Sequence, residues 1–469
     1  MASARKYEDK VRKNGVTRFI VAWILVILQA VVFIGIAVIG LRPFFIWVDI
    51  ISRVAAFFLA MGIYAQNRSI SVKTPWIIII LTFPVVGIFL YFYYGLSGSV
   101  RRMRIRIGKI EETLKPYMPP DERVIDEFEK TDPHIAGISK YLNRNTIYPV
   151  YRNTRVTYFA TALEGLEAQI EALKHAKKFI FMEYFAIENG RGWSGIAEVL
   201  DQKLAEGVEV RILYDDVGSL WFVDRDFKKS LREKGIYAKV FNPVMPVWKI
   251  FFNNRDHRKI TVIDGEVGFT GGYNIADQYF NYKPRFGEGK DTGVKLEGDA
   301  VDGLTGAFLE MWSAARKRET IDPAADLTPY FRTPEMKAKK IGGTEGMFVH
   351  PFADAPVAKE QVAEEVYIGI IDNAVNYVYF MTPYLIITEE MSHALIAAAK
   401  RGVDVRIITP GIPDKKMAYA LAKSHYRDLL RAGVKIYEYT PGFVHAKVFV
   451  SDDRKAVVGT INLDYRSLY

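Results

Sequence analysis

Three apolar segments occupy the first hundred residues of the chain. The first, Phe19 to Leu41, carries no charge and is as long as a helix that crosses the hydrocarbon core of a membrane. The second, Phe44 to Ala65, is interrupted only by Asp49 and Arg53, which share one face of a helix and can pair. The third, Pro75 to Gly95, is uncharged and has aromatic residues near its ends, as interfacial anchors do. This pattern predicts a membrane region of two or three apolar helices.

Basic residues flank this region on both sides, which constrains its topology. Because Lys and Arg favour the cytoplasmic side, both flanks are expected there, and an even number of crossings follows. Three full spans would be odd, so either one segment is re-entrant or interfacial, or one flank departs from the rule; Pro84 would permit a bend. A cleaved signal peptide is the rival interpretation of the first run. The expected location is the cell membrane, multi-pass, with the rest of the chain in the cytoplasm. The flanking residues are Arg5, Lys6, Lys10, Arg12, Lys13 and Arg18, then Arg101, Arg102, Arg104 and Arg106.

From about Asn145 onward, short β-rich runs alternate with helical stretches, which predicts an α/β fold. An internal repeat divides this part. FIFMEYF at 179–185 corresponds to VYFMTPY at 378–384, and GVEVRIL at 207–213 corresponds to GVDVRII at 402–408. We therefore predict two homologous halves related by a pseudo-twofold axis, with a site at their seam. The predicted boundaries are a membrane region 1–100, a basic linker 101–144, a first half 145–320, a connector 321–346 and a second half 347–469.

Each half carries the same polar constellation at the same point of the repeat. In a strand, His and Lys two positions apart project from one face. An imidazole can attack phosphorus, and a second imidazole can protonate the leaving oxygen. Two lysines and two asparagines would stabilise charge on the phosphate oxygens. The first half supplies His257, Lys259, Asp264, Gly271, Gly272 and Asn274, and the second half supplies His445, Lys447, Asp452, Gly459, Thr460 and Asn462, at identical intervals.

Charge and composition limit the kinds of substrate, binding partner and cofactor that the chain can have. The formal net charge is +9 and the sequence pI is about 9.2, which favours phosphorylated substrates, nucleic acid or an anionic membrane surface. The chain has no cysteine, so disulfides, zinc–thiolate sites and thiol nucleophiles are excluded. The histidines outside the motifs lack ligand-like spacing, and we expect neither a metal nor another cofactor.

The paired motifs resemble the doubled HxKxxxxD signature of the phospholipase D superfamily, and the resemblance extends over essentially the whole chain. The finer resemblance is to bacterial cardiolipin synthases. It rests on the apolar stretch Trp76 to Gly95 followed by basic residues, on Thr382-Pro-Tyr384, and on the run Gly459 to Ser467. The resemblance implies a duplicated phospholipase D-type α/β/α sandwich preceded by N-terminal transmembrane helices.

The resemblance also implies a reaction. Members of this family join two phosphatidylglycerol molecules into cardiolipin and release glycerol, through a phospho-histidine intermediate. We expect His257 to be the nucleophile and His445 the general acid and base. Asp264 and Asp452 belong to the motif in a structural role, and residues Asn274, Asn462, Gly272 and Thr460 are expected to bind substrate. Phosphatidylglycerol and cardiolipin are the expected partners; no nucleic acid is expected, and a homo-oligomer stays open.

The chain departs from the family pattern at several points. A motif histidine of this superfamily leans on a downstream carboxylate, for which Asp291 or Glu288 is available in the first half, and Asp291 is the better candidate. The second-half counterpart is expected just beyond Tyr469, which leaves the positioning of His445 in question. The run 242–252 is an apolar insert ahead of His257 that could dip into the membrane or pack on the core as a loop.

Other functions stay open on the sequence. A phospholipase D-type hydrolase or nuclease would use the same motifs with water as acceptor. The apolar N-terminus favours a lipid, and no dense basic patch with interleaved aromatic residues indicates nucleic acid. Other lipid acceptors, such as phosphatidylethanolamine, are also compatible. A non-enzymatic membrane scaffold is disfavoured because both motifs are intact.

Overall fold

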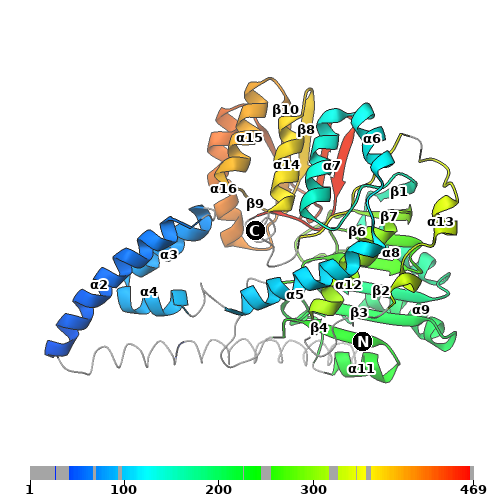
Figure 1. Ribbon diagram of the computed structural model, residues 1–469, viewed down its shortest axis with the longest axis horizontal. Helices are drawn as coiled ribbons and strands as arrows, with labels where there is room; N and C mark the ends of the chain where they lie inside the picture. Colours follow the sequence, from blue (N-terminus) through cyan, green and yellow to red (C-terminus); the bar gives the residue numbers. More distant parts are fainter. Residues whose placement is uncertain are drawn as a thin grey trace. The chain divides into compact units, whose positions relative to one another are not determined.

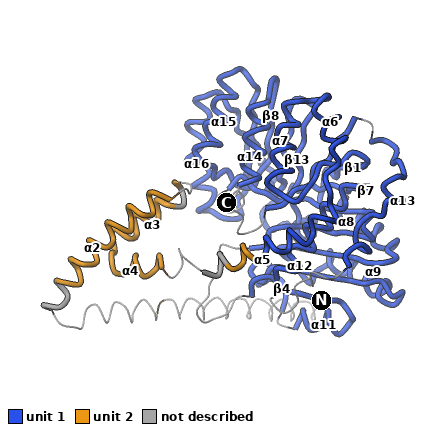
Figure 2. Tube along the Cα trace, viewed as in Figure 1, with its two compact units in different colours: residues 1–16, 107–245, 249–469 blue, residues 17–106, 246–248 orange. Residues whose placement is uncertain are grey.

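A computed structural model describes residues 27, 42–66, 70–92, 98–224, 226–243, 255–315, 326–344, 346–354 and 361–464. The chain forms two compact units (Figure 2). The main unit takes most of its residues from Ile107–Met245 and Lys249–Tyr469, and the N-terminal unit takes most of its residues from Thr17–Arg106. Each unit is described by itself below.

The N-terminal unit contains one helix that is long and apolar enough to cross a membrane, as far as the described residues go. This is α2 (Arg42–Tyr64), in its Trp47–Tyr64 portion. Most large apolar side chains of this portion are exposed, so it is not the core helix of a globular domain. The predicted pairing of Asp49 with Arg53 is confirmed at 2.8 Å. The first apolar run lies outside the described residues except for Ile27.

The third apolar run forms two helices, with a break at the place where Pro84 was expected to permit a bend. It gives α3 (Ile70–Thr82), a break at Phe83, and then α4 (Pro84–Leu90), which turns back along α3. A Cβ atom on Gly87 would lie only 2.6 Å from the Ile80 Cα, so the two helices are in close backbone contact. The break is explained by Pro84, which begins a new helix and restrains the residue before it. A bundle of several spanning helices is therefore not confirmed.

The main unit begins with helices, which occupy most of the basic linker expected over 101–144. They are α5 (Gly98–Leu114), whose second half belongs to this unit, the short η2 (Lys115–Tyr117), α6 (Glu122–Thr131) and α7 (Pro133–Asn145). Asp121 and Asp132 accept hydrogen bonds from the first free N–H groups of α6 and α7, which fixes where these helices start. Leu142 of α7 packs into the core of the second half, so this segment is part of the folded unit.

The first half is built on a seven-stranded sheet in the order β1-β7-β6-β5-β2-β3-β4 (Figure 1). Strands β2, β3 and β4 are parallel, and β5, β6, β7 and β1 continue the sheet with antiparallel neighbours. The strands are β1 (Thr154–Phe159), β2 (Phe179–Tyr184), β3 (Glu209–Asp215), β4 (Tyr237–Phe241), β5 (Lys259–Ile263), β6 (Val267–Gly271) and β7 (Gly293–Gly298). The helices are α8 (Ala162–Leu173), α9 (Arg191–Ala205), α10 (Asp216–Ser219), α11 (Phe227–Glu233) and α12 (Val301–Ala314).

The second half repeats the central part of this topology. Its five-stranded sheet has the order β11-β10-β8-β12-β13, which matches β4-β3-β2-β5-β6 strand by strand and direction by direction. The predicted duplication is therefore confirmed. The strands are β8 (Tyr377–Met381), β10 (Asp404–Pro410), β11 (Lys435–Tyr439), β12 (Val448–Ser451) and β13 (Lys455–Val458), with β9 (Leu385–Ile386) and β14 (Leu463–Asp464) as a separate pair. The helices are α14 (Val362–Asp372), α15 (Glu389–Lys400) and α16 (Lys416–Arg431).

Local sequence explains the repeated βαβ units. The residues of β2 are buried on both faces, as expected for a central strand covered by helices, and β2 reads as a continuous apolar run apart from Glu183. After α11 and α16 the chain turns at Gly235 and Gly433, with φ of +95° and +99°. That conformation favours glycine because a Cβ would clash. Within the connector expected at 321–346, the described part holds η3 (Thr328–Tyr330) and α13 (Pro334–Ala338).

Candidate active site

The two motif histidines lie at equivalent points of the two sheets. His257 stands two residues before β5, and His445 stands three residues before β12. In both halves the motif lysine donates a hydrogen bond to the backbone carbonyl of its own histidine, Lys259 to His257 and Lys447 to His445. The lysines are 1% and 4% exposed, so two amino groups are held inside the protein next to the histidines. Buried cations need an anionic partner, and a phosphodiester would supply it.

Each histidine is oriented by the opposite half. The His257 Nδ1 lies 3.0 Å from the carbonyl oxygen of Thr460, and the His445 Nδ1 lies 2.6 Å from Oδ2 of Asp291. A carbonyl or carboxylate oxygen only accepts, so both Nδ1 atoms carry a proton. Each neutral ring then has its lone pair on Nε2, the atom required for attack on phosphorus or for proton transfer.

This crossed arrangement corrects one expectation. Asp291 was expected to support the histidine of its own half, and the positioning of His445 was expected to depend on residues after Tyr469. Instead Asp291 contacts His445, and the main-chain N–H of His445 donates to the Lys290 carbonyl at 2.8 Å. The reason is that the loop before β7 contacts the segment that leads into β12 of the second half. This contact depends on how the two halves dock.

The contact between Asp291 and His445 also explains why position 272 is a glycine. The family pattern has a serine here, but a Cβ on Gly272 would lie 2.0 Å from Oδ1 of Asp291 and 2.9 Å from the His445 carbonyl. Glycine leaves the space that the carboxylate occupies. Burial and the motif lysines lower the pKa of His445, and the Gly272 carbonyl offsets a small part of that shift, as the carbonyl of Thr460 does for His257. Gly272 and Thr460, which were expected to bind substrate, thus lie against the histidine rings.

The motif aspartates close the turn behind each strand. Asp264 accepts hydrogen bonds from the backbone N–H groups of Lys177, Lys178 and Phe179 at 2.7–2.8 Å. Asp452 accepts from Val375, Asn376 and Tyr377 at 2.8–3.0 Å. Both adopt φ of +54°, which short polar side chains tolerate. These contacts support the structural role expected for both aspartates.

The two asparagines are buried beside the histidine loops. The Asn274 Oδ1 accepts from the Ala186 N–H at 3.0 Å, and its Nδ2, near the Tyr279 hydroxyl, has no hydrogen-bond partner among the described residues. The Asn462 Nδ2 donates to Asp464 at 3.1 Å. Asn274 therefore offers a buried donor to a substrate oxygen, whereas the amide of Asn462 is engaged within the second half.

Burial and like charges shift the pKa values of the site. Burial first, and then the charges of Lys259 and Lys447, hold the pKa of His257 well below its usual range. Burial, Lys447 and Lys259 do the same for the pKa of His445. Burial raises the pKa of Asp291 to about 6 and lowers the pKa of Lys447 to about 8. A bound phosphodiester would offset the lysine charges and make protonation of a histidine easier.

Sequence reasoning missed several groups next to His445. The Tyr279 ring centroid lies 4.8 Å from that of His445, and Tyr384, Asp414 and Lys415 form a polar cluster in the second half. A signal for the cluster was present: Asp414 and Lys415 follow the carboxyl end of β10, a parallel strand, and α/β sites gather at such ends.

Two further observations concern the periphery of the site. In the part of the chain that the structure describes, no group of three or more His, Cys, Asp or Glu residues could hold a metal ion. The apolar insert 242–252 lies outside the described residues except for Asn242 and Pro243.

Comparison with known proteins places these features in a family. The family described as "Cardiolipin synthase, PLD-like domain" matches residues 169–286 and 367–469, which include both motifs. A cardiolipin synthase of Halalkalibacterium halodurans is 31% identical over 423 residues, covering 90% of this chain and 82% of that protein. Cardiolipin synthase 2 of Bacillus anthracis is 33% identical over 421 residues, covering 89% and 79%.

One further relative and one solved structure carry no functional information for this chain. An uncharacterized protein of Streptococcus mutans is 47% identical over 405 residues, covering 86% of this chain and 85% of that protein. The crystal structure of phosphatidylserine synthase from Haemophilus influenzae aligns with a TM-score of 0.49 and 16% identity, covering 71% of this chain and 83% of that chain.

The duplicated α/β fold and the facing His-Lys motifs define an enzyme of the phospholipase D superfamily, in its phosphatidyltransferase class. Within that class, the chain belongs to the cardiolipin synthase family.

Proposed function

We propose that this enzyme makes cardiolipin by transferring a phosphatidyl group between two phosphatidylglycerol molecules, with release of glycerol. The observation that carries the assignment of roles is the unequal support of the two histidines. His445 contacts a carboxylate and His257 contacts a neutral carbonyl. A carboxylate stabilises an imidazolium, so His445 suits proton transfer, and His257 suits nucleophilic attack as a neutral ring.

The first step breaks the bond between phosphorus and the headgroup oxygen. The Nε2 of His257 attacks the phosphorus of the donor lipid and forms a phospho-histidine, while His445 gives its Nε2 proton to the departing glycerol oxygen. In the second step His445 takes the proton from a hydroxyl of the second phosphatidylglycerol. That oxygen attacks phosphorus, the P–N bond breaks, and cardiolipin leaves with His257 restored. Lys259, Lys447 and Asn274 stabilise charge on the phosphate oxygens throughout.

We further propose a multi-pass location in the cell membrane with the main unit on the cytoplasmic side, at an anionic surface. The support is the apolar α2 together with basic residues on both flanks of the apolar region. The proposed domains are a membrane region 1–100, a helical lead-in 101–144, two halves at 145–320 and 347–469, and a connector between them.

The test is reconstitution of the purified protein in phosphatidylglycerol vesicles with mass spectrometry of the lipids. Cardiolipin and glycerol in equal amounts are expected from the parent protein, and neither from His257→Ala or His445→Ala. Phosphatidic acid as the sole product would contradict the transferase proposal and place the enzyme among the hydrolases.

A further inference from the structure

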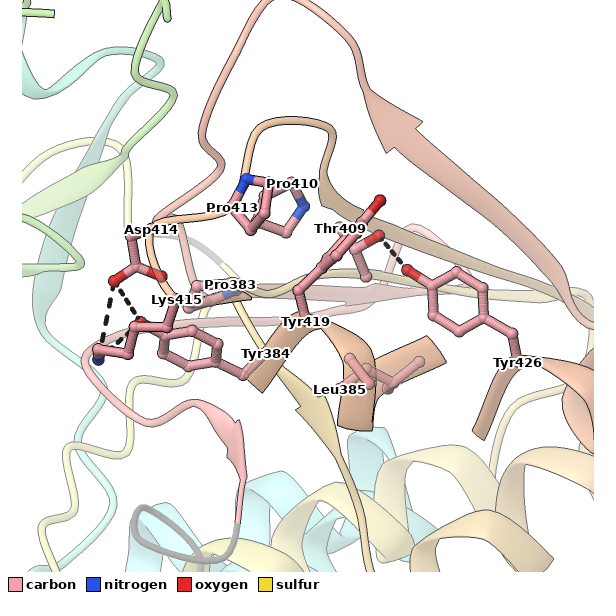
Figure 3. Close-up of a pocket in the computed structure, with 11 residues that line it drawn as sticks. Pro383, Tyr384, Leu385, Thr409, Pro410, Pro413, Asp414, Lys415, Tyr419 and Tyr426 are labelled. Carbon is pink, nitrogen blue, oxygen red and sulfur yellow. Dashed lines mark hydrogen bonds and ion pairs between the residues drawn. The ribbon is translucent and has the colours of Figure 1, made fainter. Parts of the chain in front are cut away.

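A small pocket in the second half lies at the carboxyl ends of β8 and β10, and the proposed reaction does not use it (Figure 3). Tyr384, Asp414 and Lys415 form one polar wall of the pocket, and the dashed lines of Figure 3 join them. The Tyr384 hydroxyl donates to Oδ2 of Asp414 at 2.7 Å, and the Lys415 Nζ donates to the Tyr384 hydroxyl at 3.0 Å. The three side chains therefore hold one another in a fixed arrangement.

This cluster has unused hydrogen-bonding capacity. The Oδ1 of Asp414 is buried and has no hydrogen-bond partner among the described residues. An unpaired buried carboxylate oxygen is costly, which indicates a site for a donor. The Lys415 side chain is 64% exposed, so its ammonium can also meet a ligand that enters from solvent or from a lipid surface.

The cluster lies close to the reacting groups. Burial is the main cause that lowers the pKa values of His445 and Lys447, and the charge of Lys415 contributes to both. Burial, with a contribution from Asp414, raises the pKa of Tyr279, whose ring lies against His445. Strand pairing brings the cluster to the same place: Met381 of β8 lies opposite Val448 of β12, so Tyr384, which follows β8, and His445, which precedes β12, lie at one end of the sheet.

We propose that Tyr384, Asp414 and Lys415 form the subsite for the headgroup of the acceptor lipid, a glycerol diol next to a phosphate. This inference rests on the proposed transferase function. Asp414 accepts a hydrogen bond from one hydroxyl of the diol, which brings the other hydroxyl to His445, and Lys415 pairs with the acceptor phosphate. The fixed cation beside Asp414 repels an ammonium headgroup, so the subsite selects a neutral diol over ethanolamine.

The partition of the phosphatidyl-enzyme between acceptors tests the subsite. With phosphatidylglycerol vesicles, Asp414→Asn and Lys415→Gln are expected to lower the ratio of cardiolipin to phosphatidic acid about tenfold, because each removes a hydrogen bond to a charged group. Lys415→Arg is expected to retain most of the parent ratio. The matched control is Lys423→Gln, at a lysine of α16, the helix that begins directly after Lys415; Lys423 pairs with Glu438. A product ratio in Asp414→Asn equal to that of the parent, with thermal stability retained, would overturn the inference.

A second arm separates this inference from the proposed function. Isotope-labelled glycerol and free ethanolamine are added as alternative acceptors, and the label distinguishes newly formed phosphatidylglycerol from the donor lipid. If the parent formed no cardiolipin, the proposed function would fail, while transfer to glycerol that drops in Asp414→Asn would still support the subsite. Equal use of glycerol and ethanolamine by the parent would contradict the selectivity.

The helical hairpin of the N-terminal unit carries a second, independent inference. Its base is polar and aromatic: Tyr91 is 1% exposed, lies edge-on to Trp76 at 5.5 Å and accepts from Gln66 at 3.0 Å. The Lys73 ammonium sits near the same end and donates to the Tyr64 and Gln66 carbonyls. The turn is apolar, and Leu81, Phe83, Val85 and Val86 are 45–62% exposed there. A polar base with an exposed apolar tip is the pattern of a segment inserted into lipid.

The hairpin is too short to cross the bilayer. The apolar part of α3, Lys73–Thr82, has 10 residues. At about 1.5 Å per residue it extends about 15 Å, half of a hydrocarbon core of about 30 Å. We propose that α3 and α4 form a re-entrant hairpin in one leaflet, with Phe83 near the bilayer centre. Both basic flanks of the apolar region then lie on one side if α2 and the preceding apolar run each cross once.

Single cysteines test this topology cleanly, because the natural chain has none. In membrane vesicles, Ala65→Cys before the hairpin and Arg102→Cys after it are expected to react with an impermeant maleimide from the same side. A fluorophore on Phe83→Cys is expected to be quenched best by lipids labelled at the chain end. Labelling of Ala65→Cys and Arg102→Cys from opposite sides would establish a crossing and refute the hairpin. Gly87→Leu, which cannot keep the helix contact, is expected to weaken the Phe83 quenching.

Discussion

The two halves of the main unit share a topology and a motif but differ in what surrounds the histidine. Strand order, strand directions and the φ of the motif aspartate agree between them. In the first half the residues beside His257 are Asp256 and Arg258, both buried and charged; the second half has Val444 and Ala446 at these positions. Arg258 pairs with Glu310 of α12 at 2.7 Å, an anchor without a counterpart beside His445.

The groups that hydrogen-bond to the two histidine rings also differ, and here the charged group is beside the histidine with apolar sequence neighbours. His445, whose sequence neighbours are apolar, receives the carboxylate of Asp291 from the first half. His257, whose neighbours are charged, receives only the Thr460 carbonyl from the second half. Duplication thus fixed the geometry of the motif, while divergence of the flanks gave the histidines unequal environments. Unequal environments allow one ring to serve as nucleophile and the other as acid and base.

The largest effect on stability is expected from Arg258→Ala. Removing one partner of a buried ion pair leaves Glu310 uncompensated and should cost about 3–5 kcal/mol in the free energy of unfolding. The measurement is denaturant unfolding of the purified protein in detergent. The double variant Arg258→Met with Glu310→Leu should lose less, since no charge is stranded. A loss below about 1 kcal/mol for Arg258→Ala would show that the first half does not depend on this anchor.

Asp291→Asn should break the catalytic asymmetry between the histidines. Without the carboxylate, His445 loses stabilisation of its imidazolium, and kcat/KM should fall about 10²-fold or more, within the range of general acid–base contributions. The fold should be retained because an amide fits the same space. Steady-state kinetics on phosphatidylglycerol with a thermal melt provides the check. Activity within threefold of the parent would remove Asp291 from the mechanism.

Gly272→Ser tests the space that the carboxylate needs. The new Cβ would displace Asp291, so activity should fall about ten- to hundredfold, as misplacement of a reacting group by about 1 Å does. Gly459→Ser is the matched variant in the second half. Open space surrounds a Cβ there, and little change is expected. Equal losses in both variants would argue against a special role for the first-half position.

The pH dependence of kcat/KM tests the groups around the two histidines separately. Asp291, with its pKa raised to about 6, loses its charge as the pH falls below that value, so kcat/KM should decline on the acid side. Lys447, with its pKa lowered to about 8, loses its charge above that value, and activity should decline on the alkaline side. Asp291→Asn should abolish the acid limb, and Lys447→Arg should move the alkaline limb upward. An acid limb unchanged in Asp291→Asn would assign it to another group.

The sequence predicted the duplication because strand alternation and glycine turns are local features that repeat visibly. The motif spacing likewise identified the histidines and lysines. The pairing of Asp291 with His445 could not be predicted, since it depends on how two separately folded sheets dock. The hairpin at Phe83 was hidden for a different reason: a bent pair of helices and one spanning helix have the same hydropathy, and Pro84 only permits the bend.

The central claim is that one site draws its two histidines from two halves, with His257 as nucleophile. A phosphatidyl ester of p-nitrophenol tests it directly, because this leaving group departs without a general acid. His445→Ala is predicted to release p-nitrophenolate in a burst of about one per active site and to carry a phosphatidyl group on His257. His257→Ala is predicted to give neither. A burst from His257→Ala with the adduct on His445 would contradict the account.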